Sequence, residues 1–207
     1  MVKRVFIIHG WDGHPDEGWF PWLKEELERK GFEVQVPEMP ETEDPKIETW
    51  VLYLAQLVGK PDENTYFVGH SIGCQAILRY LEYLPDGEKI GGAVFVAGWF
   101  TLESLGTDEE TETARPWLET PIDFEKIKNR TQNFTAIFSD NDPYVPAENQ
   151  KMFKESLGAK ITVEHKKGHF SGNDKITELP SALEAVLEIS LPAASASSAG
   201  TAAGKSS

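Results

Sequence analysis

Residues 69–73, with the sequence Gly-His-Ser-Ile-Gly, constrain the fold more than any other part of the chain. They follow a run of β-branched and aromatic residues at 65–68, which predicts a buried strand. Apolar side chains then recur at helical spacing over residues 74–81, and Pro85 prevents the helix from continuing. A serine between strand and helix, with a glycine two residues away on each side, is typical of a strained turn. The stretch therefore predicts a nucleophile elbow that projects the Ser71 hydroxyl above a sheet.

Short apolar runs alternate with amphipathic segments along the rest of the chain. Further strands are expected at residues 2–8, 32–36, 93–97, 134–138 and 161–165, helices at residues 16–31, 47–58, 123–130 and 147–157, and a closing segment at residues 177–189. This alternation predicts an α/β fold with a mostly parallel sheet and helices on both faces. We expect a single domain over residues 1–191.

Two segments do not fit the alternation. The pattern dissolves between residues 99 and 121, so we expect a small flap over the sheet edge there and no large lid. The acidic run at residues 107–112 within it is interpreted as a solvated surface. Residues 192–207 are almost entirely Ala, Ser, Gly and Thr, a composition that predicts a disordered tail.

Composition limits the partners and the compartment of this 207-residue chain. Its net charge of −14 argues against nucleic acid and against anionic membrane surfaces. The longest apolar stretch, residues 93–100, is far shorter than a membrane span, and the run at residues 5–8 is too short for a signal peptide. The single cysteine, Cys74, cannot form an internal disulfide. We therefore expect a cytoplasmic protein, whose oligomeric state the sequence does not indicate.

Chemically useful groups follow four predicted strands. Ser71 follows the elbow strand, and residues 139–146 after a later strand offer carboxylates. Residues 166–170 offer the imidazole of His169, and residues 9–11 after the first strand offer backbone amides. Because the carboxyl ends of parallel strands meet at one edge of a sheet, these groups are expected to converge. Ser, Asp and His in this chain order are what a hydrolase of this architecture requires.

Each group has a defined task in such a site. Serine needs a base to accept its proton, which a neutral imidazole does near pH 7. A carboxylate fixes the imidazole tautomer and stabilises the imidazolium as it forms. The oxyanion of the tetrahedral intermediate would be bound by the backbone N–H groups of Ile72, which follows the nucleophile, and of Trp11.

The chain resembles the retinoblastoma-binding protein 9 family of small α/β hydrolases. The resemblance rests on the small size, on His-Gly-Trp at residues 9–11, on the elbow, on Asp142 in Asp-Pro-Tyr-Val-Pro and on the Gly-His-Phe around His169, and it spans residues 2–189. It implies a compact α/β-hydrolase fold, the triad Ser71, Asp142 and His169, and hydrolysis of esters or peptides. A Leu-x-Cys-x-Glu segment is missing from the sequence, so retinoblastoma protein is not expected as a partner.

Two triad positions have rivals nearby. Asp140 is an alternative acid, because either aspartate could simply cap a turn; the match of Asp-x-x-Val-Pro to the family pattern favours Asp142. His165 is an alternative base. Alternation with Ile161 and Val163 makes it a half-buried strand residue, whereas His169 follows a glycine in a loop that can turn it inward.

Metal and phosphate sites are weakly supported. His165 and His169 have the spacing of a zinc pair, but that spacing requires a helix and Gly168 lies between them. The aspartates near residue 140 lack the third ligand and the glycine of a calcium loop. Residues 200–206 resemble a phosphate-binding loop one residue short, with no preceding strand. We therefore expect neither metal nor cofactor.

The remaining histidines and tryptophans receive looser assignments. His9 and His70 are expected to hold the oxyanion loop and the elbow by hydrogen bonds. Tryptophan is as often a core residue as a pocket residue. Three side chains are nevertheless expected to line the substrate pocket: His14, Trp99 and Trp117.

The sequence therefore predicts a serine hydrolase that cleaves a small ester, thioester or amide through an acyl-enzyme intermediate. Two alternatives stay open. The same triad could run acyl transfer or a lyase reaction, or the chain could be a non-catalytic binding protein on a hydrolase scaffold. A scaffold under no catalytic demand has no reason to keep a strained serine, which argues against the second alternative.

Overall fold

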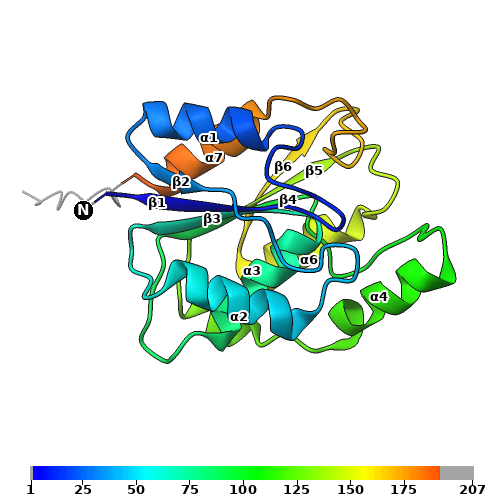
Figure 1. The fold of residues 1–207 in the computed structure, drawn as a ribbon, viewed down its shortest axis with the longest axis horizontal. Coiled ribbons are helices and arrows are strands. Elements are labelled where there is room, and N and C mark those ends of the chain that lie inside the picture. Colours follow the sequence, from blue (N-terminus) through cyan, green and yellow to red (C-terminus); the bar gives the residue numbers. More distant parts are fainter. Residues whose placement is uncertain (1, 192–207) are drawn as a thin grey trace, which may run out of the picture.

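A six-stranded parallel sheet forms the centre of the protein (Figure 1). The structure is a computed structural model that describes residues 2–191. Its strands are β1 (Arg4–Ile8), β2 (Glu33–Gln35), β3 (Thr65–His70), β4 (Gly92–Val96), β5 (Phe134–Ser139) and β6 (Lys160–Glu164). They lie in the order β2-β1-β3-β4-β5-β6, and each pairs with its neighbour in parallel. The predicted α/β fold is confirmed, and the predicted tail at residues 192–207 lies outside the described residues.

Helices cover both faces of the sheet (Figure 1). One face carries α1 (Phe20–Arg29) and α7 (Pro180–Ile189). The other carries α2 (Ile47–Val58), α3 (Ile72–Tyr83), α5 (Phe124–Lys128) and α6 (Glu148–Leu157). Each layer has its own core, one centred on Trp19 and Leu23 of the α1 side and the other on Trp50 and Phe153. Because both faces are covered, every residue of β3, β4 and β5 is buried, and these strands read as continuous apolar runs.

The segment predicted to be an irregular flap contains a helix, α4 (Asp108–Glu119). Thr107 begins it with a capping box, because its side chain accepts the Glu110 N–H while the Glu110 carboxylate accepts the Thr107 N–H. The pair Thr-x-x-Glu is the sequence signal of such a cap. Residues 107–112 are all exposed, so the predicted solvated surface is confirmed, whereas the expected lack of regular structure was wrong because acidic side chains also favour a helix N-terminus.

One end of α4 is anchored in the core and the other is exposed. Trp117 is buried, and the Arg79 guanidinium donates hydrogen bonds to the carbonyls of Trp117 and Thr120 at 2.9 and 3.0 Å. The first residues of the helix are exposed. Figure 1 places α4 at the lower right, toward the carboxyl ends of the strands and on the side of the sheet that carries α2 and α3. The helix is therefore a fixed wall at the end of the sheet where β3 delivers Ser71.

The chain reverses its direction of winding at β1. From β1 it passes first to β2 on one side and then to β3 on the other. Loops leave the carboxyl ends of β1 and β3 in opposite senses at such a point, which opens a crevice between them. Ser71 follows β3, and Gly10 and Trp11 follow β1, so the fold brings the predicted nucleophile and the predicted oxyanion loop to the same crevice.

Candidate active site

Ser71 sits in a backbone conformation that non-glycine residues rarely adopt, with φ 53° and ψ −124°. Its N–H donates a 2.9 Å hydrogen bond to the Val96 carbonyl of the adjacent strand. Both flanking glycines are sterically required. A Cβ on Gly69 would lie 2.8 Å from the Cys74 nitrogen, and one on Gly73 would lie 2.4 Å from the Ile8 carbonyl oxygen. The sharp turn from β3 into α3 therefore depends on both glycines.

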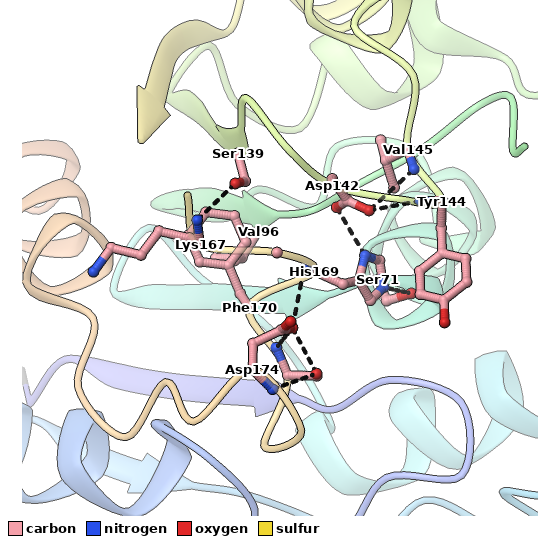
Figure 2. Close-up of polar contacts among 12 residues, drawn as sticks. Ser71, Val96, Ser139, Asp142, Tyr144, Val145, Lys167, His169, Phe170 and Asp174 are labelled. Carbon is pink, nitrogen blue, oxygen red and sulfur yellow. Dashed lines mark hydrogen bonds and ion pairs between the residues drawn. The ribbon is translucent and has the colours of Figure 1, made fainter. Parts of the chain in front are cut away.

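The side chains of Ser71, His169 and Asp142 lie in a row (Figure 2). His169 Nε2 is 2.9 Å from Ser71 Oγ, and His169 Nδ1 is 2.8 Å from Asp142 Oδ2. With the proton on Nδ1, the ring donates to the carboxylate and leaves Nε2 free to accept the serine proton. The three residues come from the ends of β3, β5 and β6, which is the convergence expected from the sequence.

Asp142 is held in a turn that commits both of its oxygens. Oδ1 accepts the backbone N–H groups of Tyr144 and Val145 at 2.9 and 3.1 Å, while Oδ2 faces His169. Only 2% of the Asp142 side chain and 13% of the His169 side chain are exposed. A carboxylate with charge-assisted donors on each oxygen has little freedom to rotate, so it fixes the ring of His169.

Asp140 and His165, the alternative acid and base, pair with each other and not with the residues beside Ser71. His165 Nδ1 lies 2.5 Å from Asp140 Oδ2, and Asp140 Oδ1 accepts the Lys166 N–H at 2.8 Å. The pKa of Asp140 is lowered, mainly by the hydrogen bond from the Lys166 backbone and next by the one from the His165 ring. His165 lies just after β6 with 73% of its side chain exposed. The expectation of a half-buried strand position for His165 was wrong, because β6 is the edge strand of the sheet and ends at Glu164, one residue before His165.

The loop that carries His169 is held by a residue that the sequence reasoning did not single out. The Asp174 carboxylate accepts the backbone N–H groups of His169 and Ser171, each at 3.0 Å, and the Ser171 hydroxyl at 2.7 Å (Figure 2). From α1's side, the Trp19 indole donates to the Phe170 carbonyl at 3.0 Å. The only signal in the sequence was an aspartate three residues after a serine, which is typical of many turns.

His70 supports the same loop from the elbow. Its Nε2 lies 2.7 Å from the His169 carbonyl oxygen, so Nε2 carries the proton and donates. Burial, reinforced by the nearby His169 ring, lowers the pKa of His70 to about 3. His9 plays the corresponding part in the β1 loop, where it accepts the Met39 N–H at 3.0 Å and bonds the Gly10 carbonyl. Both histidines therefore make the hydrogen bonds expected for structural roles.

The neutral state of His70 predicts a specific acid sensitivity. In the unfolded chain it titrates near pH 6.5 and in the folded protein near pH 3, so between these values the unfolded state binds the extra proton and stability falls as the pH falls. Between pH 6.5 and pH 4.5, we expect the unfolding free energy of wild type to fall by about 2 kcal/mol more than that of His70→Gln, which lacks the titrating imidazole. Urea denaturation at both pH values measures this difference, and parallel losses in the two proteins would contradict it.

Two backbone N–H groups face the same crevice as the serine. Within residues 2–191, the N–H groups of Trp11 and Ile72 have no hydrogen-bond acceptor. Gly10 brings the β1 loop close to the elbow, since a Cβ there would lie 3.4 Å from Ser71 Cβ and 3.1 Å from His70 Nδ1. The Trp11 indole anchors the loop by a 3.0 Å bond to the Glu43 carbonyl. Unpaired donors beside a nucleophile are what an oxyanion requires.

A cavity of about 770 Å³ opens over Ser71. Trp99, one of three predicted pocket residues, lines it together with Trp11, Leu102 and Tyr144. Trp117 does not line this cavity, because it packs in the core and its indole donates to the Pro45 carbonyl at 2.8 Å. His14 does not line it either. It lies exposed in the loop before α1.

Other reactive chemistry is not assembled in the part of the chain that the structure describes. Cys74 is fully buried behind the elbow, and burial raises the pKa of its thiol far above neutral pH. No cluster of three metal-ligating side chains is found among residues 2–191. His165 and His169, whose spacing resembles that of a zinc pair, face different aspartates. Ser71 is thus the hydroxyl that this arrangement presents to the cavity beside a histidine ring.

The fold and the crevice define the class of protein. The chain belongs to the serine hydrolase family, whose profile matches residues 5–188, and it is an enzyme of that class. It is 34% identical over 184 residues to the YdeN protein of Bacillus subtilis (strain 168), covering 87% of this chain and 92% of that protein. The crystal structure of the ydeN gene product has a TM-score of 0.83 at 31% identity, covering 91% of this chain and 98% of that one.

Two further relatives extend the comparison. The serine hydrolase RBBP9 of Rattus norvegicus is 27% identical over 158 residues, which cover 76% of this chain and 80% of that protein. The resemblance predicted from the motifs thus holds at the level of the family, with YdeN more similar in sequence than RBBP9. Est1E from Butyrivibrio proteoclasticus shares the fold at 18% identity and a TM-score of 0.68, covering 91% of this chain and 88% of that one.

None of the helices within residues 2–191 combines the length and the apolarity that crossing a bilayer requires.

Proposed function

We propose that this protein hydrolyses a small ester, thioester or amide through an acyl-enzyme on Ser71, with His169 as base and Asp142 as the residue that orients it. The observation that carries the proposal is the continuous chain of short contacts, 2.9 Å from Ser71 Oγ to His169 Nε2 and 2.8 Å from His169 Nδ1 to Asp142 Oδ2. Membership in the serine hydrolase family supports the same chemistry.

The first half of the reaction forms the acyl-enzyme. Ser71 Oγ attacks the substrate carbonyl carbon while its proton passes to His169 Nε2. Asp142 stabilises the resulting imidazolium through Nδ1–H. The N–H groups of Trp11 and Ile72 bind the oxyanion, and the N-terminus of α3 adds its positive dipole end. The imidazolium then protonates the departing alcohol, thiol or amine, and the acyl group stays on Ser71.

The second half restores the enzyme. Water replaces the leaving group beside His169, gives its proton to Nε2 and attacks the acyl carbon. Collapse of the second tetrahedral intermediate returns the proton to Ser71 Oγ and releases the acid. These steps need no cofactor, because the three side chains exchange all the protons. The positive φ of Ser71 also favours this proposal over a binding scaffold, since a strained backbone persists where function requires it. A cytoplasmic location remains a prediction.

Covalent labelling tests the proposal directly. A fluorophosphonate probe should form a stoichiometric adduct with the folded protein, and peptide mass mapping should place the adduct on Ser71, because activated serines attack phosphorus and ordinary serines do not. His169→Gln should slow labelling by at least about a hundredfold, since general-base catalysis is worth roughly 10² to 10⁴. Adducts spread over several serines, or equal rates for wild type and His169→Gln, would overturn the proposal. A chelator should leave the labelling rate unchanged.

A further inference from the structure

The wall of the cavity over Ser71 carries charge of one sign only. Among residues 2–191, six carboxylates line it and no lysine or arginine does: Asp12, Glu17, Glu43, Glu109, Glu110 and Asp174. The chain contains 20 basic residues against 34 acidic ones, so more than a third of its charged side chains are basic. The composition alone therefore does not account for a wall without a single permanent cation.

These carboxylates also lack cationic partners elsewhere. Ion pairs occur on many exposed surfaces of the protein, yet none between described residues involves any of the six. Glu17, Glu110 and Asp174 accept backbone hydrogen bonds, which hold them in place. The side-chain carboxylates of Asp12, Glu43 and Glu109 accept no hydrogen bond from a described residue. Their negative charge is left to act on whatever enters the cavity.

The six carboxylates lie on three separate parts of the cavity wall. Asp12 and Glu43 belong to the β1 and β2 loops, which are joined by the bond from the Asp12 N–H to the Thr42 carbonyl at 2.9 Å. Glu109 and Glu110 belong to the first turn of α4. Glu17 and Asp174 lie on the side of the His169 loop, where Glu17 Oε1 faces the Gly172 N–H at 3.4 Å. Because charges of one sign surround a concave site, their fields add inside it rather than cancel.

We propose that the substrate of this site carries a positive charge on the part remote from the scissile carbonyl, and that anionic acyl compounds are rejected. This inference rests on the proposed function and narrows its substrate class. An ammonium or guanidinium group would be attracted during approach and would find unpaired carboxylates on reaching the wall. Phosphorylated esters and thioesters with polyphosphate leaving groups would bring like charges together, which costs binding energy.

Three para-nitrophenyl esters test the proposal with matched shape. They share a three-methylene acyl chain and end in trimethylammonium, in tert-butyl or in carboxylate, so the first two differ in charge and hardly in volume. Each kcat/KM is divided by the rate of hydroxide-catalysed hydrolysis of the same ester, which removes intrinsic reactivity. At low ionic strength we expect the cationic ester to exceed the anionic one by about 10- to 100-fold, with the neutral ester between them.

Added salt and mutations test whether the wall carboxylates cause the preference in kcat/KM for the cationic ester. Raising NaCl to about 0.5 M shortens the screening length to roughly 4 Å and should shrink the preference at least about threefold. The triple variant Asp12→Asn, Glu43→Gln, Glu109→Gln should reduce the cation-to-anion ratio by about fivefold or more at low salt. Glu119→Gln removes a charge from the same helix α4 at a position outside the cavity wall, and it should leave the ratio within about 1.5-fold of wild type.

The outcomes distinguish this inference from the function on which it rests. If the neutral ester is hydrolysed by a Ser71-dependent reaction but the anionic ester is hydrolysed as fast as the cationic one, the charge preference is wrong and the hydrolase proposal stands. If none of the three esters is hydrolysed and fluorophosphonate does not label Ser71, the hydrolase proposal itself fails. An equal loss of the ratio in Glu119→Gln would assign the preference to net charge and overturn the role of the wall.

Discussion

Replacing Ser71 with alanine is expected to lower kcat on an activated ester by roughly 10⁵ to 10⁶, to a residual rate supplied by the oxyanion donors and by binding. The reason is that Ser71 Oγ is the proposed nucleophile, which lines the cavity with its proposed base, His169 Nε2, at 2.9 Å. The measurement is hydrolysis of a para-nitrophenyl ester by wild type and variant, with thermal unfolding monitored in parallel. A variant that keeps a tenth of the wild-type rate would contradict the assignment.

Ser71→Gly serves as the matched control, because it removes the same hydroxyl but relaxes the backbone. Alanine must still adopt φ 53° and ψ −124°, whereas glycine populates positive φ readily. Both variants should be inactive, and Ser71→Gly should be more stable than Ser71→Ala by about 1 to 3 kcal/mol, the usual cost of such a backbone conformation. Equal stability of the two variants would mean that the elbow stores no strain.

Replacing Asp142 with asparagine is expected to reduce kcat by roughly 10³ to 10⁴. The amide keeps the shape of the carboxylate but can donate to His169 Nδ1, which selects the tautomer with a proton on Nε2 and leaves no acceptor for the serine proton. The turn should survive, because the asparagine oxygen can still accept the N–H groups of Tyr144 and Val145. Values of kcat/KM on a generic ester, measured across pH, give the size of the loss.

Asp140→Asn is the matched control for this prediction, since Asp140 lies two residues earlier and pairs with exposed His165 rather than with His169. We expect the loss in Asp142→Asn to exceed that in Asp140→Asn by at least about tenfold, which corresponds to ~1.4 kcal/mol of transition-state stabilisation. A dead Asp140→Asn enzyme beside a nearly normal Asp142→Asn enzyme would show that the acid had been assigned to the wrong residue.

The two candidate pairs illustrate where sequence reasoning stopped. Chain order and the predicted strand ends indicate two candidate aspartates and two candidate histidines. Hydrophobic periodicity does not predict which aspartate faces which imidazole ring. The structure divides them into an inner pair, Asp142 with His169, and an outer pair, Asp140 with His165. The division depends on how the loops after β5 and β6 turn. Loops are set by hydrogen bonds between segments that are far apart in sequence, which no local pattern encodes.

The elbow and the sheet were predictable because their causes are local. The glycines at residues 69 and 73 are demanded by backbone contacts within one turn, and the uniformly apolar β3 and β4 reflect burial on both faces. Helix α4 was missed although its capping box is also local. Its acidic first turn is exposed to solvent, and an acidic run by itself does not distinguish a loop from a helix that begins with the Thr107 and Glu110 capping box.

By itself, the sequence of this protein determined the α/β fold, the strained Ser71 turn and the order of Ser, Asp and His, because each follows from local backbone sterics and hydrophobic periodicity. Only the tertiary structure decided that Trp99 lines the cavity while Trp117 fills the core, and that Asp174 holds the loop of His169. It also decided that carboxylates from loops and from the first turn of α4 line one cavity. These features depend on contacts between segments that are far apart in sequence. The packing and electrostatic energies of such contacts cannot be inferred from either segment alone.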